Sequence, residues 1–241
     1  SGDDFAGSYS GLFANANVGS GKTVNITSSY SGSDVSNYSV TNQTSTTADI
    51  SAKALTATAS ASNKVYDGSS TATTTLSLSG FIGSETVTST NSSTFNNKNA
   101  GTGKTVTVNS ITLADGSNGG LAANYSISTG QTTTANITAK SLTVSGITAS
   151  NKTYDGGTAA ATTLSFSGLI GSETLGQTVG STFNNKNVGA GKTVTVNSIT
   201  LADGSNGGLA ANYSISPGQT TTANVTTKAL TVSGITASNK T

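Results

Sequence analysis

Apolar and polar residues alternate along much of this chain, which is the pattern of a strand with one buried face. In the stretch 104–109, the valines at 106 and 108 alternate with threonine, lysine and asparagine. Leu76 and Leu78 alternate with polar neighbours, and so do Ala135 and Ile137. The sequence shows no convincing apolar spacing at i, i+3, i+4 and i+7, the mark of an amphipathic helix. The pattern therefore predicts an all-β protein built from short strands.

The alternation changes parity at defined points. Ile111 and Leu113 continue the pattern of 104–109 with the opposite parity. The change of parity means that one extra residue separates the two sets of apolar positions. A strand can keep the same face buried only if this residue bulges out or the strand breaks, so we expect a bulge or a strand break near Asn109 and Ser110. A second parity change, at 140–141, separates two further stretches of alternation.

The same motifs recur every 88 residues. Tyr66-Asp67-Gly68 returns as Tyr154-Asp155-Gly156, and the segments 94–128 and 182–216 differ at two of their 35 positions. A more diverged copy occupies the start of the chain, where Ala16 stands at the position of Lys98 and Lys186. Self-similarity at a fixed period is the mark of a repeat architecture.

The repeats predict four segments. Residues 1–53 are a partial repeat that holds the C-terminal part of a unit, and 54–140 and 141–228 are complete repeats. Residues 229–241 match the first strand of a further repeat. Because the first and last segments are incomplete, we expect the sequence to be part of a longer array.

Glycines mark the boundaries between strand segments, as at Asp67-Gly68 and Asp115-Gly116. Asp-Gly is a strong turn signal because glycine accepts positive φ and the aspartate side chain bonds its own backbone. The spacing of these signals predicts about six to eight short strands per repeat. We expect tandem small β domains, either β-sandwich or β-grasp-like, that repeat every 88 residues in an elongated array.

The composition narrows the classes of protein further. Only 9% of the residues are charged, the formal net charge is +1, and there is one proline, which together favour thin folded β domains over disorder. There is no cysteine for a disulfide, and all 11 basic residues are lysine, which argues against nucleic-acid binding. No apolar run approaches the roughly 20 residues that span a bilayer.

Few residues are suited to catalysis or to metal binding. Histidine and cysteine are absent, and most carboxylates recur once per repeat, which suits turn residues better than an array of identical active sites. Calcium takes six to eight oxygen ligands, usually with several carboxylates together, and here only Asp3 and Asp4 are adjacent. We therefore expect no enzymatic activity, no cofactor and no metal site. Lys–Asn isopeptide bonds and N-glycosylation stay open, because their residue types are common throughout.

The Tyr-Asp-Gly motif has two interpretations. It could bind a ligand, with Tyr66, Asp67, Tyr154 and Asp155 as the candidates, or it could be a turn in which the tyrosine packs over the edge of a small core. The turn is the favoured interpretation. The structural motif as a whole comprises Tyr66, Asp67, Gly68, Phe95, Asn124, Tyr125, Tyr154, Asp155, Gly156, Phe183, Asn212 and Tyr213, with the two phenylalanines as core anchors.

These ordered motifs resemble the YDG repeat of very large secreted bacterial proteins, which include filamentous-haemagglutinin-like adhesins exported by two-partner secretion. The resemblance rests on Tyr-Asp-Gly, on Thr-Phe-Asn-Asn-Lys-Asn-(Ala/Val)-Gly-x-Gly-Lys at 94–104 and 182–192, and on Asn-Tyr-Ser at 124 and 212. It covers essentially the whole chain. It implies a β domain, an extracellular or bacterial cell-surface location, a role in adhesion or biofilm formation, and no catalytic residues.

Three functions follow as hypotheses. The leading one is a structural stalk or spacer of an adhesin. The second is weak binding of polysaccharide by each repeat, strengthened by multivalency. The third is an extracellular fibre in which 229–241 of one chain complement the first unit of the next. The expected partners are other repeats of the same chain or fibre, with extracellular polysaccharide or a host or cell surface as further candidates. We expect no nucleic-acid partner and no membrane span.

Overall fold

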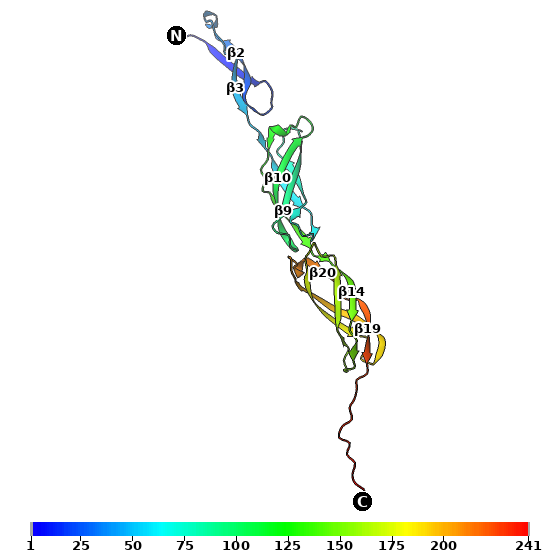
Figure 1. Cartoon of the computed structure of the whole chain (residues 1–241). Coiled ribbons are helices and arrows are strands. Elements are labelled where there is room, and N and C mark those ends of the chain that lie inside the picture. The colour runs from blue at the N-terminus through cyan, green and yellow to red at the C-terminus, as the bar shows by residue number, and fades with distance from the viewer. Residues whose placement is uncertain (1, 241) are drawn as a thin grey trace. The chain divides into compact units, whose positions relative to one another are not determined.

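The computed structural model describes residues 2–240 and is all-β, as the sequence predicts (Figure 1). The chain divides into two compact units. The first takes in the chain up to Ala61 together with 72–94 and 105–134, and the second takes in 62–71, 95–104 and the chain from Ala135 onward. Within residues 2–240, no helix is long and apolar enough to cross a membrane.

The partial repeat forms a three-stranded antiparallel sheet. In it β1 (Ala6–Phe13) pairs with β2 (Gly19–Ser31), and β2 pairs with β3 (Ser45–Ile50). The short 3-10 helix η1 (Val35–Asn37) connects β2 to β3. Among the described strands, β3 lies at the edge of this sheet with one neighbour.

The middle repeat, 54–140, contains eight strands, which is within the predicted range. A five-stranded sheet has the order β6-β12-β10-β9-β7, and β5 pairs with β8 in a smaller sheet. Just before this repeat, β4 (Lys53–Ala54) pairs in parallel with β11. The elements are β5 (Thr56–Ala61), β6 (Lys64–Val65), β7 (Thr71–Ala72), β8 (Thr74–Ser79), β9 (Val87–Phe95), β10 (Gly101–Asp115), η2 (Ala122–Asn124), β11 (Tyr125–Ser126) and β12 (Thr132–Thr138).

The last repeat, 141–228, reproduces this order as β15-β21-β19-β18-β16 with the smaller sheet β14-β17. At its start β13 (Lys140–Ser141) pairs in parallel with β20. The five-stranded sheet is mixed, because β15 runs parallel to β21 while the other ladders are antiparallel. The elements are β14 (Thr143–Ala149), β15 (Lys152–Thr153), β16 (Ala159–Ala160), β17 (Thr162–Ser167), β18 (Leu175–Phe183), β19 (Gly189–Asp203), η3 (Ala210–Asn212), β20 (Tyr213–Ser214) and β21 (Thr220–Thr226).

A β-bulge accounts for the parity change along the longest strand. In the β18–β19 ladder Gly180 pairs with Ser198, whereas Ser181 pairs with Val196, so Asn197 is an extra residue on β19. Asn197 is the counterpart of Asn109, where the sequence predicts a bulge or a break. The strand continues through the irregularity, and the extra residue lets both halves of β19 keep their apolar side chains on the inner face.

The cores are small and lie between the two sheets of a repeat. In the second unit Phe183 and three small side chains form a buried cluster, against which Ala149 of β14 and Ala160 of β16 pack. Two sheets that share a core form the sandwich arrangement. Phe95 and Phe183 are each 3% exposed, which confirms both as core anchors.

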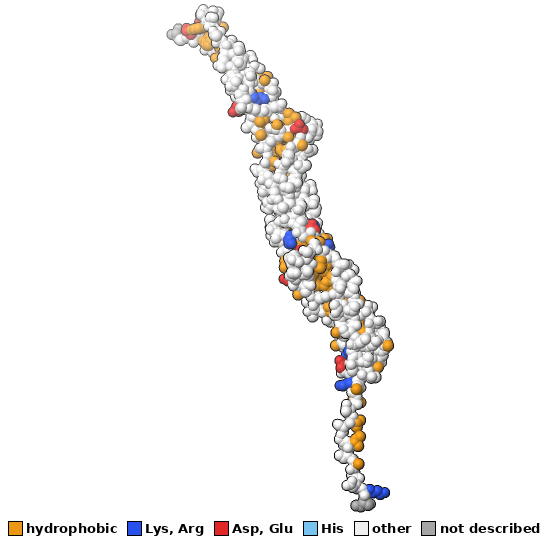
Figure 2. All heavy atoms as spheres, viewed as in Figure 1, with side chains coloured by type: hydrophobic (Ala, Val, Ile, Leu, Met, Phe, Trp, Pro, Cys, Tyr) orange, Lys and Arg blue, Asp and Glu red, His pale blue; other side chains and the backbone are white. Residues whose placement is uncertain are grey.

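The surface is mainly uncharged and polar, with few and scattered charged side chains (Figure 2). Residues 227–240 form no strand, and their apolar side chains Leu230, Val232 and Ile235 are 77–89% exposed. This differs from the expected strand over 229–241, whose last residue lies outside the described residues. The corresponding strand β14 is held by β17, whereas no described strand pairs with residues 227–240.

Candidate functional site

Each Tyr-Asp-Gly motif is a turn that a lysine holds closed. Asp67 Oδ1 accepts a hydrogen bond from the N–H of Ser69 at 2.9 Å, and Gly68 has a φ of +79°, as the Asp-Gly pair predicts. Lys64 Nζ lies 2.8 Å from the same aspartate oxygen and also donates to the carbonyl of Thr71 at 3.0 Å. Burial raises the pKa of Asp67, but hydrogen bonds from Lys64 and Ser69 outweigh it and lower the pKa overall.

The second Tyr-Asp-Gly turn is built in the same way. Lys152 Nζ lies 2.8 Å from Asp155 Oδ1, which accepts a hydrogen bond from the N–H of Gly157 at 2.9 Å. In both turns the lysine amine also lies 5.7 Å from the ring centre of the core phenylalanine, Phe95 or Phe183. The lysine two residues before the tyrosine is therefore part of the motif, and its recurrence at 64 and 152 is the signal for it in the sequence.

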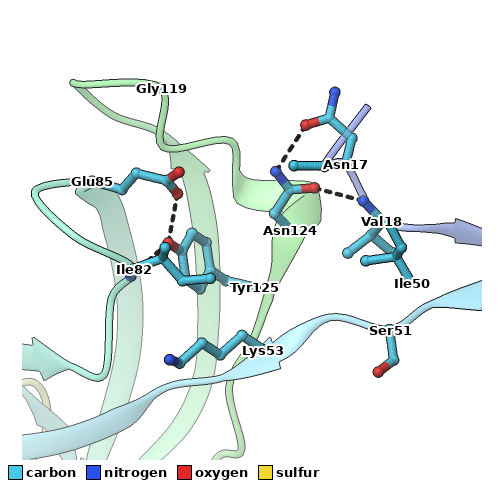
Figure 3. Close-up of a pocket in the computed structure, with 11 residues that line it drawn as sticks. Asn17, Val18, Ile50, Ser51, Lys53, Ile82, Glu85, Gly119, Asn124 and Tyr125 are labelled. Carbon is cyan, nitrogen blue, oxygen red and sulfur yellow. Dashed lines mark hydrogen bonds between the residues drawn. The ribbon is translucent and has the colours of Figure 1, made fainter. Parts of the chain in front are cut away.

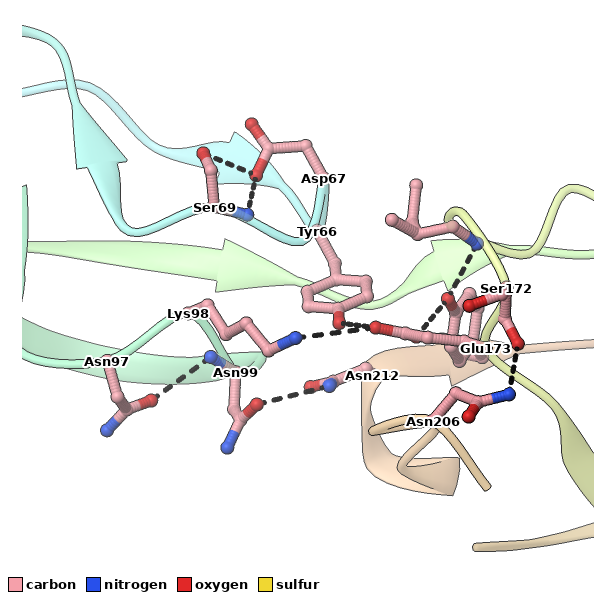
Figure 4. Close-up of polar contacts among 12 residues, drawn as sticks. Tyr66, Asp67, Ser69, Asn97, Lys98, Asn99, Ser172, Glu173, Asn206 and Asn212 are labelled. Carbon is pink, nitrogen blue, oxygen red and sulfur yellow. Dashed lines mark hydrogen bonds and ion pairs between the residues drawn. The ribbon is translucent and has the colours of Figure 1, made fainter. Parts of the chain in front are cut away.

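Tyr66 of the first turn is buried against the next repeat. Its side chain is 1% exposed, and its hydroxyl donates a hydrogen bond of 2.6 Å to Oε1 of Glu173 (Figure 4). Tyr213 donates to the other oxygen of Glu173, also at 2.6 Å, and accepts a hydrogen bond from the N–H of Ile170 at 3.0 Å. The rings of Tyr66 and Tyr213 pack edge to face with centres 5.5 Å apart, a favourable aromatic geometry.

Asn212 makes a second connection beside this carboxylate. It is fully buried, its Oδ1 accepts the N–H of Ala100 at 2.8 Å, and its Nδ2 donates to Asn99 Oδ1 at 3.2 Å. Lys98 Nζ lies 3.5 Å from Glu173 Oε1. We call this cluster the tyrosine–glutamate junction, defined by Tyr66, Lys98, Asn99, Ala100, Glu173, Asn212 and Tyr213. All of its members lie in the second unit, and it joins the middle repeat to the last.

The junction fixes the protonation states of its members. Burial raises the pKa of Glu173, but hydrogen bonds from Tyr213, Tyr66 and Lys98 outweigh burial, and its pKa lies below the ordinary value. Burial, followed by the hydrogen bond to Glu173, raises the pKa of Tyr66 and of Tyr213 to about 12. At neutral pH a charged carboxylate is therefore held by two neutral hydroxyls.

We expect the free energy of unfolding to fall at both ends of the pH range. The lowered pKa of Glu173 gives stability that is present above about pH 4.3, its unfolded value, and is lost as the pH falls through the folded-state pKa. The raised pKa of Tyr66 and of Tyr213 gives stability that is present below about pH 10 and is lost as the pH rises through about 12. Urea unfolding at a series of pH values measures both effects.

The variant Glu173→Gln is the control for the acidic effect, because its side chain cannot ionise. The difference in unfolding free energy between the parent chain and this variant should shrink as the pH falls. A difference that stays constant through the acidic range would contradict the assigned role of the carboxylate.

We expect Tyr66→Phe to lower the free energy of unfolding by about 1.5–3 kcal/mol, the range for a hydrogen bond to a charged group. The matched control is Tyr154→Phe, because no partner for the Tyr154 hydroxyl is found within residues 2–240. Its loss should stay within about 0.5 kcal/mol. Equal losses from the two variants, measured by urea unfolding, would show that the hydrogen bond from Tyr66 to Glu173 does not stabilise the fold.

The first unit contains the same hydrogen bonds of the tyrosine and the asparagine as the junction, which we call the frame of the junction. Tyr125 donates to Glu85 Oε2 at 2.6 Å and accepts the N–H of Ile82 at 3.1 Å (Figure 3). Asn124 Oδ1 accepts the N–H of Val18 at 2.9 Å, and Asn124 Nδ2 donates to Asn17 at 3.1 Å. The partial repeat is thus connected to the middle repeat by the same pair of asparagine hydrogen bonds.

The two frames differ in what covers the carboxylate. In the first unit, no counterpart of Tyr66 reaches Glu85 from the described residues, and Ala16 occupies the position of Lys98. A cavity of about 170 Å³ lies there instead. We call it the Glu85 cavity, and its lining includes Ala16, Asn17, Val18, Ile50, Ser51, Lys53, Ile82, Glu85, Gly119, Asn124 and Tyr125.

The candidate ligand-binding residues are therefore placed in different surroundings. Tyr66 is covered by the junction, whereas Tyr154 is half-buried against the core of its own repeat. Asp67 and Asp155 are each paired with a lysine. The role of Glu173 was missed, and the signal available in the sequence was that Glu85 and Glu173 recur at the same position of the repeat.

Fold and junction together define a tandem-repeat, all-β protein in which consecutive repeats are connected through buried polar side chains. The sequence matches the YDG domain twice, over residues 51–135 and 138–223. The chain belongs to the YDG domain family. No curated protein and no solved structure matches it.

Proposed function

We propose that these repeats are the structural stalk or spacer of a bacterial cell-surface or secreted adhesin, of the filamentous-haemagglutinin-like type exported by two-partner secretion. In this function the repeats hold a binding region of the adhesin at a distance from the cell and contribute to adhesion or to biofilm and matrix formation. The repeats themselves carry out no catalysis.

The tyrosine–glutamate junction is the observation that carries this proposal. Connections between independent domains are commonly exposed, flexible linkers that permit relative motion. Here Tyr66, Glu173 and Asn212 connect two repeats and are all at least 93% buried. Hydrogen bonds to a buried charge are among the stronger ones, so the junction resists separation of the repeats. A spacer needs this property if load is to pass from one repeat to the next.

The surface composition supports the same function. With 9% charged residues and a net charge of +1, the chain lacks the strong field that draws nucleic acid or an oppositely charged partner. Threonine, serine and asparagine keep such a surface hydrated. Repeats with this surface can be added in series without adding a specific partner at each one.

Single-molecule force extension tests this function. We expect a sawtooth in which the two complete repeats unfold in equal steps of roughly 300 Å, from 88 residues at about 3.3–3.6 Å each. The variant Glu173→Ala should lower the force of the unfolding events without changing their step length. A featureless extension of the parent chain would contradict the spacer function.

A fibre assembled by strand complementation is the second candidate function. It is favoured by the segment 227–240, which forms no strand. In it Leu230 and Val232, two positions apart, and Ile235 are all exposed. Such a segment could add to a free strand edge of another chain. Sedimentation velocity at increasing concentration tests this, and a chain that stays monomeric throughout would contradict it.

A further inference from the structure

We propose that Asn118 and Asn206 are sites of spontaneous deamidation, and that Asn206 is the faster of the two because Lys98 lies beside it. The modification converts each asparagine to aspartate or isoaspartate close to the glutamate of its repeat, Glu85 or Glu173. The inference concerns a modification site and does not rest on the adhesin function.

The two asparagines occupy the same position in the glycine-rich loop of the two complete repeats. The stretch Leu-Ala-Asp-Gly-Ser-Asn-Gly-Gly-Leu-Ala is identical at 113–122 and 201–210, and it contains both Asn-Gly pairs of the chain. Asn118 and Asn206 have φ angles of +55° and +56°, and among the described residues only glycines share a positive φ with them. Asparagine adopts this conformation more readily than most residues with a side chain, which accounts for its place in the loop.

The chemistry of an Asn-Gly pair needs only water. The backbone nitrogen of the glycine loses its proton and attacks Cγ of the asparagine, the bond from Cγ to Nδ2 breaks, and ammonia leaves, which closes a succinimide ring. Water then adds to either carbonyl carbon of the ring and opens it to aspartate or to isoaspartate. Because glycine has no Cβ, no side chain of its own shields the attacking nitrogen.

Both loops leave the attacking nitrogen free. Within residues 2–240, the N–H of Gly119 and the N–H of Gly207 donate no hydrogen bond. Both glycines and both asparagines are exposed, so water reaches the succinimide as soon as it forms. The reacting groups are therefore accessible in the folded chain.

Lys98 distinguishes the two loops. A Cβ added at Gly207 would lie 3.8 Å from Nζ of Lys98, whereas one added at Gly119 would meet nothing within 4 Å. Ala16 stands at the position of Lys98 in the repeat that precedes Gly119. The attacking nitrogen is negatively charged once it has lost its proton, and a nearby positive charge favours the charged form. The amine of Lys98 therefore favours the reaction at Asn206, although the two loops have the same sequence.

Deamidation removes a contact that positions the glutamate. Asn206 Nδ2 donates to the carbonyl of Ser172, the residue before Glu173, at 3.0 Å (Figure 4). Asn118 Nδ2 makes the same bond to the carbonyl of Ser84 at 2.9 Å. At neutral pH an aspartate has no side-chain proton to donate, and it adds a negative charge close to a carboxylate. The modification of Asn206 therefore weakens the tyrosine–glutamate junction as the chain ages.

The variant Asn206→Asp reproduces one product of the reaction and tests this weakening. Its urea midpoint should lie below that of the parent chain, and the midpoint of the parent chain should fall as the modified fraction of Asn206 rises. Midpoints that stay unchanged in both experiments would contradict a role of this amide in the junction.

Peptide mapping by mass spectrometry tests the reaction itself, on the whole chain incubated at mildly alkaline pH. Cleavage after lysine places Asn118 in the peptide 105–140 and Asn206 in the peptide 193–228. We expect both to lose their amide nitrogen faster than the other asparagines of these peptides. Asn206 should react about two- to fivefold faster than Asn118, the range for an interaction between partly exposed charges.

Two controls separate the effect of the fold from that of the sequence. In denaturant the two identical loops should react at equal rates. In the folded chain, Lys98→Gln should slow Asn206 to the rate of Asn118, whereas a general loosening of the junction by this change would speed the reaction. Equal rates at the two sites of the folded parent chain would overturn the proposal. Rates no higher than those of the other asparagines, or a faster Asn206 in Lys98→Gln, would also overturn it.

Discussion

Replacing Glu173 with alanine is expected to lower the free energy of unfolding by about 2–6 kcal/mol, because two buried hydroxyls lose their acceptor. The carboxylate is 7% exposed and accepts hydrogen bonds from Tyr66 and Tyr213, both at 2.6 Å. Its removal leaves two buried hydroxyls without an acceptor and leaves the amine of Lys98 without its carboxylate. Each unsatisfied buried group costs roughly 1–3 kcal/mol. Urea unfolding followed by circular dichroism measures the loss.

The matched control is Glu85→Ala, the same change at the same position of the preceding repeat. Glu85 is half-buried and holds one tyrosine, Tyr125, so we expect a loss of about 1–2 kcal/mol. The difference between the two variants isolates the contribution of the residues that only the second unit supplies. If both variants lost the same stability, the contacts of Tyr66 and Lys98 with Glu173 would contribute nothing to the free energy of unfolding.

Gly68→Ala is expected to be the second most damaging change. Gly68 has a φ of +79°, where a residue with a Cβ is strained by roughly 1–2 kcal/mol. A Cβ there would also lie 2.8 Å from Cγ2 of Ile170, in the next repeat, and one of the two must move. Overpacking of this kind adds typically 1–3 kcal/mol. The total loss expected in urea unfolding is therefore about 2–5 kcal/mol.

Gly156 provides the comparison for this prediction. It occupies the same position of the second Tyr-Asp-Gly turn and has a φ of +84°, but a Cβ added to it would meet nothing within 4 Å. Gly156→Ala should therefore cost only the backbone strain. Equal costs at the two glycines would mean that the turn at Gly68 does not press against Ile170.

Local features of the fold could be predicted from the sequence because they depend on residues close together in the chain. The alternation around Val106 and Val108 predicts the long strand, and its change of parity predicts a bulge or break near Asn109, where the counterpart Asn197 forms a bulge in the last repeat. The Asp-Gly pairs predict the turns, because aspartate and glycine determine the backbone geometry there. Phe95 and Phe183 are recognisable as core anchors because they are large apolar residues in a sequence that contains few.

The candidate site could not be predicted in the same way. Tyr66 and Glu173 are 107 residues apart, and each has a near-identical counterpart, Tyr154 or Glu85, in very different surroundings. What separates the counterparts is the neighbouring repeat that covers one and not the other. The pattern of a single sequence carries no signal for that difference. The same reasoning applies to 229–240, whose apolar and polar residues alternate as they do in β14 but which pair with no described strand.

The tyrosine of one Tyr-Asp-Gly turn, Tyr66, joins its repeat to the next through Glu173. A double-mutant cycle between Tyr66→Phe and Glu173→Ala tests it most directly, with unfolding free energies measured in urea for the parent chain, both single variants and the double variant. The control cycle pairs Tyr154→Phe with Glu173→Ala and should be additive within about 0.5 kcal/mol. We expect the Tyr66–Glu173 cycle to give a coupling energy of about 1–3 kcal/mol. Additivity within about 0.5 kcal/mol in that cycle as well would contradict the claim.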